Sequence, residues 1–341
     1  MKFRHATSRR SHPREHWDGS RFDIGGSRGF YESYFQRANH PNRPLAFWIR
    51  YTAFSPRNKP DQATGELWAI FFDGEKHRTT AVKESFPVAN CAFSRTSLDV
   101  TIGEARLTGQ GLDGFAASNG ESIGWSLRYS GQDSPLLLLR EARYDGGFPQ
   151  AKALVNKPNA RFTGRVAVNG VVLSVDDWQG SLNHNWGGRH TDRYSWGQVA
   201  GFDNAPSVFL ECATAQLKFG PIWSPQVSPV VLRTEDAEFA LNGIVRAMRT
   251  TARIEFFRWD IDARQADVGI AGFFHASRSD FVALRYPNPP GGETLCLNTK
   301  IASAEFTLRI TGKPPRTLST RNRAAFEIVT DRIDHGVPVV L

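Results

Sequence analysis

Hydrophobic and polar residues alternate along most of the chain with the two-residue period of β-strands, and no long stretch has the period of a helix. Runs rich in β-branched and aromatic residues are separated by glycine, proline, asparagine and aspartate, which favour turns. Asn169-Gly170 and Asp73-Gly74 each predict a type I′ hairpin turn, because these residues tolerate positive φ. The expected strands are 30–35, 45–54, 66–72, 123–129, 162–168, 171–175, 194–202, 207–217, 230–233, 238–241, 253–262, 280–286 and 304–310.

This pattern predicts an all-β fold. Many short strands at close spacing favour sandwiches or barrels, whereas Rossmann folds and TIM barrels need long helices between strands. The 341 residues, 40% of them hydrophobic, exceed the size of about 250–300 residues at which a single core stops growing. We therefore expect a flexible basic arm at 1–24, a β-barrel at 25–178, a linker loop at 179–191 and a second barrel at 192–341.

The charge distribution limits the classes of binding partner that the sequence supports. The first 30 residues hold seven basic and three acidic residues, so they carry +4 of the net charge of +8. A solvated arm is the simplest interpretation, and contact with an anionic membrane surface is the alternative. No zinc-finger, RNP or helix-turn-helix pattern supports nucleic-acid binding.

The same composition argues for a cytoplasmic protein. No run of about 20 apolar residues could span a membrane, and no apolar signal segment is visible. The three cysteines, Cys91, Cys212 and Cys296, are far apart, which excludes a disulfide scaffold and a cysteine zinc site.

Chemically versatile residues concentrate in the middle of the chain. Alternate side chains of a strand share a face, so Tyr194, Trp196 and Gln198 are expected to point the same way. Together with His184 and Trp186 just before them, this face predicts a pocket wall of aromatic rings with polar groups. An interdomain hinge packed by the two tryptophans is the alternative.

No metal and no cofactor are expected. His184, His190 and Asp192 are residues of the right types for a metal site, but the flexible pair Gly187-Gly188 lies between them and no third nitrogen or sulfur ligand follows. The chain also lacks the nucleophile elbow of a Ser-His-Asp hydrolase, a P-loop and a dinucleotide-binding glycine motif in a suitable context.

Glu32 is the candidate acid. It shares a face with Phe30 and Tyr34 in an expected strand, and burial among aromatic rings would raise its pKa and keep a proton available near neutral pH. The alternative is a structural salt bridge, to Arg37 or to Arg50 on a neighbouring strand.

Further ring-bearing strands supply the remaining candidates. Trp48 and Arg50 share a face, and rings around a cavity would hold an apolar ligand and stabilise a developing cation. Glu66, near Trp68, and Glu211 match the description of Glu32 more weakly and are interpreted as structural.

Four segments also carry a resemblance to a known family. GFYESYFQRANHPNRPLAFWIRYT, GELWAIFFDGE, WQGSLNHNWGGRHTDRYSWGQVAGFD and PNPPGGETLCLNTK resemble the AttH / hydroxyneurosporene synthase-like family, which includes carotenoid hydratases. They are more distantly similar to tocopherol cyclase, in its aromatic-Glu and HNWG motifs. The resemblance runs from about residue 28 to 310.

The resemblance implies two packed lipocalin-like (calycin) barrels, with a prenyl, carotenoid-type or other hydrophobic substrate. Characterised relatives hydrate or cyclise isolated double bonds without redox cofactors. Matched by motif, the family's site positions fall on Glu32, His184, Trp186 and Tyr194. The Tyr-x-Asp of the carotenoid hydratases has no counterpart near Glu211.

Three functions therefore stay open. The first is an enzyme that hydrates or cyclises a hydrophobic alkene, with Glu32, His184 and Tyr194 as catalytic residues and Trp48, Arg50, Trp186, Trp196 and Gln198 as substrate-binding residues. The second is a carrier or sensor that binds a hydrophobic metabolite without chemistry. The third is a structural protein whose barrels have filled interiors.

Overall fold

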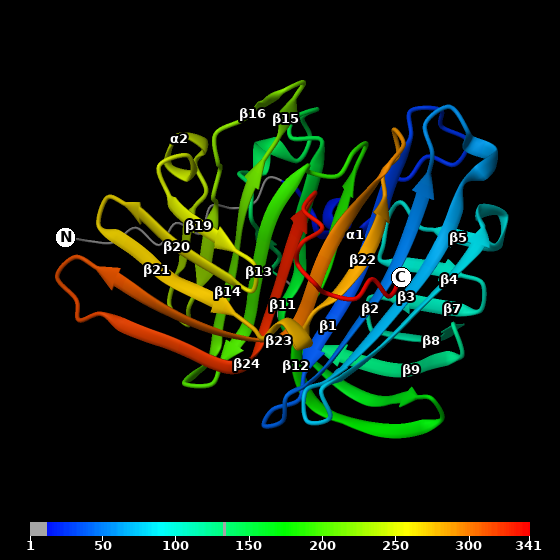
Figure 1. Ribbon diagram of the computed structural model, residues 1–341, viewed down its shortest axis with the longest axis horizontal. Coiled ribbons are helices and arrows are strands. Elements are labelled where there is room, and N and C mark those ends of the chain that lie inside the picture. The colour runs from blue at the N-terminus through cyan, green and yellow to red at the C-terminus, as the bar shows by residue number, and fades with distance from the viewer. Residues whose placement is uncertain (1–11, 132–133) are drawn as a thin grey trace.

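The computed structural model describes residues 12–131 and 134–341, and β-strands dominate it (Figure 1). Most strands belong to two antiparallel sheets, of 12 and 10 strands. The first sheet contains β1 (Phe30–Asn39), β2 (Leu45–Ser55), β3 (Thr64–Asp73), β4 (Arg78–Pro87), β5 (Cys91–Phe93), β6 (Asp99–Ile102), β7 (Ala105–Thr108), β8 (Gly111–Ser118), β9 (Glu121–Ser130), β10 (Leu136–Leu137), β11 (Ala151–Val168) and β12 (Val171–Gly187). The second contains β13 (Arg193–Phe202), β14 (Ala205–Gln216), β17 (Val230–Arg233), β18 (Glu238–Leu241), β19 (Thr251–Glu255), β20 (Arg258–Gln265), β21 (Val268–His275), β22 (Val282–Pro287), β23 (Glu293–Ile310) and β24 (Arg316–Thr330).

Smaller elements complete the described part of the chain. They are the hairpin of β15 (Lys218–Phe219) and β16 (Ile222–Trp223), the short helices α1 (Arg14–Asp18) and α2 (Ile244–Ala247), and 3-10 turns that include η3 (Glu141–Arg143).

The first sheet curls into a nearly closed barrel. The backbone N–H of Lys83 on β4 donates to Ser118 Oγ on β8 at 3.1 Å, and the N–H of Ala117 donates to the Glu84 carboxylate at 3.4 Å, so the end strand β4 meets β8 across the barrel opening. Aromatic side chains fill its interior: Tyr34, Phe47, Phe71, Trp125, Phe162 and Trp178.

The second sheet repeats the plan of the first. In each sheet the first strand pairs with the last, β1 with β12 and β13 with β24, and the last two strands form a long hairpin. Its interior is also packed, around Trp259, Phe274, Phe306 and Phe326. The predicted all-β fold of two packed antiparallel barrels is confirmed. The shared strand order shows a repeat that the sequence does not display.

One of the two expected hairpin turns forms. Asn169 and Gly170 join β11 to β12 with φ of 49° and 80°, as a type I′ turn requires. The second prediction is wrong, because β3 and β4 are joined by the longer connection 74–77, in which His77 has the positive φ of 50°.

The HNWG segment is a strand, which corrects the expected linker loop at 179–191. Strand β12 continues to Gly187, so only residues 188–192 connect the two sheets. Its glycines serve close packing instead of flexibility. A Cβ on Gly180 would lie 1.8 Å from the carbonyl oxygen of Arg37, and one on Gly187 would lie 2.4 Å from that of Gln150.

The described part of the expected arm is folded, which corrects the flexible arm at 1–24. Trp17 and Phe22 are 1% and 3% exposed, because both rings pack against the first sheet. Residues 1–11, which carry most of the arm's basic groups, lie outside the described residues. Within the described ranges no helix has the length and apolar character needed to cross a membrane.

Candidate active site

A cavity of about 400 Å³ lies where the two sheets face each other. Strands β1, β2, β11 and β12 of the first sheet contribute to its wall, and so do β13, β14, β22 and β24 of the second. In Figure 1 the second sheet lies to the left and the first to the right, so the cavity belongs to the seam between them.

Strand alternation directs the lining side chains to the seam. Along β2, Phe47, Ile49 and Tyr51 point into the first barrel. Trp48, between them, packs with Trp196 in the cluster that joins the sheets. The prediction of a shared face on β13 is confirmed, since Val199 faces the second core while Trp196 faces the seam.

The cavity brings together five of the eight predicted site residues. Trp48, Arg50, His184, Tyr194 and Trp196 belong to its wall. The other three lie elsewhere: Glu32, Trp186 and Gln198.

Glu211 is the most unusual group in the wall. It is 2% exposed, and its Oε1 accepts a hydrogen bond of 3.0 Å from the indole N–H of Trp196. Among the described residues its Oε2 has no hydrogen-bond partner. Burial raises the pKa of Glu211 to about 7, although Trp196, Gln198 and the positive charge of Arg37 act in the opposite direction. Glu211 is therefore a carboxylic acid that can hold a proton near neutral pH.

A buried ion pair lies beside the two tryptophans. Lys300 is fully buried and donates to Glu327 at 2.7 Å and to the Asn298 side chain at 2.6 Å. Its ammonium lies 5.7 Å from the ring of Trp48 and 5.6 Å from that of Trp196. Glu327 belongs to the cavity wall, and its carboxylate is neutralised there by the ammonium that lies near these rings.

Arg50 supplies a cation at the same wall. It is 5% exposed and donates to Ser33 Oγ at 2.6 Å, but its Nε has no partner among the described residues. The guanidinium lies 4.8 Å from the ring of Tyr286. A buried guanidinium that has no carboxylate partner in the described part of the chain favours a ligand that brings an acceptor oxygen.

Neutral polar groups complete the wall. The ring of His190 stacks on Tyr31 at 3.9 Å, and burial, together with the charge of Arg50, lowers its pKa to about 3. Burial raises the pKa of Tyr31, Tyr194 and Tyr286 above the ordinary phenol value. At neutral pH the imidazole is therefore uncharged and the three phenols keep their protons.

Glu32 and His184 form a buried pair behind this wall. Glu32 Oε1 lies 2.8 Å from His184 Nε2, and both side chains are fully buried. The Glu32 carboxylate also accepts hydrogen bonds from Ser20 Oγ and from the backbone N–H groups of Arg21 and Phe22. Burial raises the pKa of Glu32, but the hydrogen bonds from His184, Ser20 and Arg21 outweigh it, and the net shift is downward. The expectation that burial would keep a proton on Glu32 is therefore wrong.

The pair fixes the N-terminal segment to the sheet. His184 Nδ1 lies 2.9 Å from the carbonyl oxygen of Trp17, which can only accept, so this nitrogen carries a hydrogen. The ring stacks on Tyr34 at 4.1 Å. Trp186 packs beside it, and the guanidinium of Arg21 lies 3.9 Å above its ring. These contacts make the pair a clasp between residues 17–22 and strands β1 and β12.

Gln198 belongs to a polar network between the sheets. Its Oε1 accepts from Arg37 Nε at 3.0 Å and from Ser181 Oγ at 2.6 Å, and its Nε2 donates to Asn183 at 2.8 Å. Every polar atom of the side chain is thus used in joining the sheets.

Glu211 is a site residue that its sequence surroundings do not single out. The only signal available was its central place in an aromatic, β-branched strand, a signal that Glu32 and Glu66 share. Pairing of β13 with β14 places Glu211 opposite Gln198, and this position at the seam depends on the packing of two distant sheets.

Comparisons with known proteins agree with this architecture. No protein-family model matches the chain. Two Mycobacterium tuberculosis proteins described as uncharacterized, MT0513 and Rv0493c, are each 24% identical over 293 residues, which cover 83% of this chain and 82% of theirs.

Three solved structures share the fold. A structure described as an AttH from Nitrosomonas europaea has a TM-score of 0.55 at 11% identity, covering 89% of this chain and 91% of its own. Kievitone hydratase from Nectria haematococca has 0.52 at 11%, covering 89% of each chain. CghA with Sch210972 has 0.54 at 12%, again covering 89% of each. At such identities the likeness shows the fold, so the chain has the two-sheet fold of the AttH and kievitone hydratase structures, as the family resemblance predicts.

Proposed function

We propose that the protein adds water, or a hydroxyl group of the substrate itself, to a carbon–carbon double bond of a hydrophobic molecule bound in the seam cavity. The observation that carries the proposal is Glu211, a buried acid at an aromatic wall whose Oε2 has no partner among the described residues. A hydratase with the same fold, kievitone hydratase, supports this class of reaction.

The proposed reaction starts with proton transfer from Glu211 to one carbon of the double bond. The other carbon becomes a cation, which the aromatic rings of Trp48 and Trp196 at the wall stabilise. An oxygen nucleophile then forms the new C–O bond and returns its proton to the Glu211 carboxylate. The sum is a redox-neutral addition, for which the chain's own acid and base suffice.

This assignment moves the acid from Glu32 to Glu211. Glu32 accepts hydrogen bonds from a ring, a hydroxyl and two backbone N–H groups and lies outside the cavity wall, whereas Glu211 belongs to that wall and has an uncommitted oxygen. In the proposal His184 positions the wall through the clasp, and Tyr194 contributes a protonated phenol to it.

The cavity rim supports a hydrophobic substrate. Four of the residues at the cavity are apolar yet exposed: Phe148, Phe219, Ile244 and Met248. Exposed apolar side chains grouped at a cavity are typical of sites for apolar ligands. The same rim would suit a carrier that binds without chemistry, which is the second candidate function.

Mass spectrometry separates the two functions. The protein is incubated with prenylated phenols and with free isoprenoids, and the recovered molecules are weighed and chromatographed. An enzyme returns a product that has gained one water or has cyclised at unchanged mass. Tight binding with complete recovery of unchanged ligand, across both compound classes, would establish the carrier.

Arg50→Met should remove a preference for ligands with an acceptor oxygen. In the wild type we expect dodecanoic acid to quench tryptophan fluorescence at a concentration about 10- to 100-fold lower than dodecanol does, because a charge-assisted hydrogen bond contributes about 1.5–3 kcal/mol. In Arg50→Met the two ligands should bind alike. Arg258→Met, on β20 outside the cavity, is the control, and an unchanged preference in Arg50→Met would contradict this role for Arg50.

A further inference from the structure

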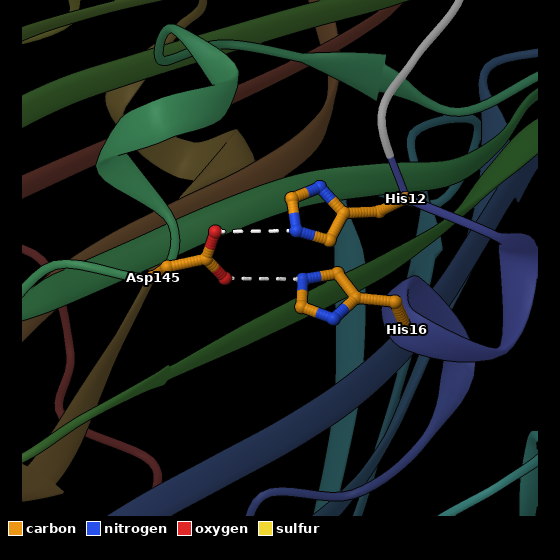
Figure 2. A group of neighbouring side chains, drawn as sticks. All are labelled: His12, His16 and Asp145. Carbon is orange, nitrogen blue, oxygen red and sulfur yellow. Dashed lines mark ion pairs between the residues drawn. The ribbon is translucent and has the colours of Figure 1, made fainter.

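Two histidines and an aspartate converge at the N-terminal segment, away from the cavity wall. Figure 2 shows the rings of His12 and His16 pointing at the carboxylate of Asp145, which follows η3. His12 Nε2 lies 3.3 Å from Asp145 Oδ2, and His16 Nε2 lies 3.3 Å from Asp145 Oδ1. One candidate ligand atom from each residue lies within 4.8 Å of the other two.

The polar contacts at this point direct one nitrogen of each ring at the same carboxylate. A carboxylate accepts hydrogen bonds, so the 3.0 Å contact of His12 Nδ1 with Glu141 places the hydrogen on Nδ1. In a neutral ring Nε2 then presents a lone pair to the oxygen of Asp145. His16 Nε2 faces the same carboxylate and is buried without a hydrogen-bond partner among the described residues. A cation bound between these atoms would give this nitrogen a partner.

The stacking of the two rings disfavours a positive charge on both of them. The rings of His12 and His16 are stacked with centroids 4.1 Å apart, so two imidazolium ions would repel each other. Two neutral rings and a carboxylate are the ligand forms that bind a divalent transition metal.

We propose that His12, His16 and Asp145 bind a zinc-class divalent metal ion, with Glu141 as the carboxylate that orients His12. In a tetrahedral zinc site with ligands at about 2.0–2.1 Å, neighbouring ligand atoms are separated by about 3.3–3.4 Å. Each histidine Nε2 lies 3.3 Å from one oxygen of Asp145, Oδ2 for His12 and Oδ1 for His16. The Glu141–His12 contact is the carboxylate–histidine arrangement that fixes the tautomer of a ligating ring. His12 precedes α1 by two residues and His16 lies within that helix.

The ion would join two segments that adjoin the candidate active site. His12 and His16 both pack on Trp17, whose carbonyl oxygen receives the hydrogen bond of His184. Asp145 lies in the segment 138–149, of which Leu138, Arg143 and Phe148 belong to the cavity wall. Metal binding would thus hold the N-terminal segment and part of the wall together, whatever reaction the cavity performs.

Zinc titration of the full chain tests the site. The protein carries no affinity tag, because a histidine tag binds zinc, and is freed of metal with a chelator that is then removed. Calorimetry should show one zinc ion bound per chain, and cobalt in its place should give the intense visible absorption of tetrahedral coordination. His16→Gln and Asp145→Asn should abolish both signals. Glu141→Gln should weaken zinc binding about 10- to 100-fold.

Control variants distinguish loss of the metal site from misfolding and from zinc binding at other histidines. Asp145 is half-exposed, so Asp145→Asn should fold normally, as circular dichroism would check. His275→Gln changes an exposed histidine on β21 and should bind zinc like the wild type. A wild-type chain that binds no zinc, or an Asp145→Asn chain that binds it unchanged, overturns the site. Neither outcome affects the proposed reaction, which does not involve the ion.

Discussion

Glu211→Gln should lower turnover about 10²–10⁴-fold, the usual contribution of a general acid, while the protein stays folded. The amide keeps the size of the side chain and can still accept from the Trp196 indole N–H, but it has no proton to give to a double bond. Initial rates on a substrate identified by mass spectrometry measure the effect, and dodecanol binding should be unchanged.

The pH dependence of turnover is a second test of Glu211 as the acid. Glu211 must be protonated to act, and burial raises its pKa to about 7. Turnover should therefore be highest below about pH 7 and fall about tenfold per unit above it.

Glu66→Gln is the matched control. Glu66 is also buried and accepts a hydrogen bond of 2.9 Å from an indole N–H, that of Trp68, but it is not part of the main cavity wall. This variant should keep its rate. A Glu211→Gln enzyme that turns over normally would reject the proposed acid.

Glu32→Gln should destabilise the protein by about 3–5 kcal/mol, the cost of removing one partner of a buried ion pair. A glutamine amide would place N–H groups against donors from Ser20, Arg21 and Phe22 and would leave His184 without its carboxylate. Chemical denaturation, with the shift in midpoint at constant slope, measures the change. Glu121→Gln, in an exposed pair with Arg78, should unfold like the wild type.

The sign of the pH dependence follows from the lowered pKa of Glu32. A carboxyl group whose pKa is lower in the folded state than its ordinary value of 4.5 contributes stability above that value and loses it as the pH falls below it. The wild type should therefore lose its advantage over Glu32→Gln in acid. If Glu32→Gln is as stable as the wild type yet inactive, the acid role returns to Glu32.

The local fold and several site residues followed from patterns within single strands. The Asn169-Gly170 turn required only two residues that accept positive φ. The shared face of Trp48 and Arg50, and that of Tyr194 and Trp196, followed from the two-residue period, and all four side chains belong to the cavity wall. The fold was also predicted by resemblance to a family, and the solved structures agree.

The errors arose where glycines and polar residues were interpreted without their neighbours. The expected loop 179–191 contains Gly180 and Gly187, whereas adjoining strands leave no space for a Cβ at either position. Glu32 was expected to keep a proton because its strand neighbours are aromatic, but hydrogen-bond donors arrive from residues 20–22, in the expected flexible arm.

Sequence alone determined the strands, the face that each side chain takes and the presence of rings and acids suited to a hydrophobic substrate, since these depend on residues close together in the chain. Tertiary structure decided that the cavity lies at the seam, that Glu211 and not Glu32 belongs to its wall, and that His12 and His16 meet Asp145. The cavity and the histidine–aspartate group depend on contacts between segments more than a hundred residues apart. The pKa of a buried carboxyl group depends on the hydrogen-bond donors and charges that surround it in space, and not on its neighbours in the sequence.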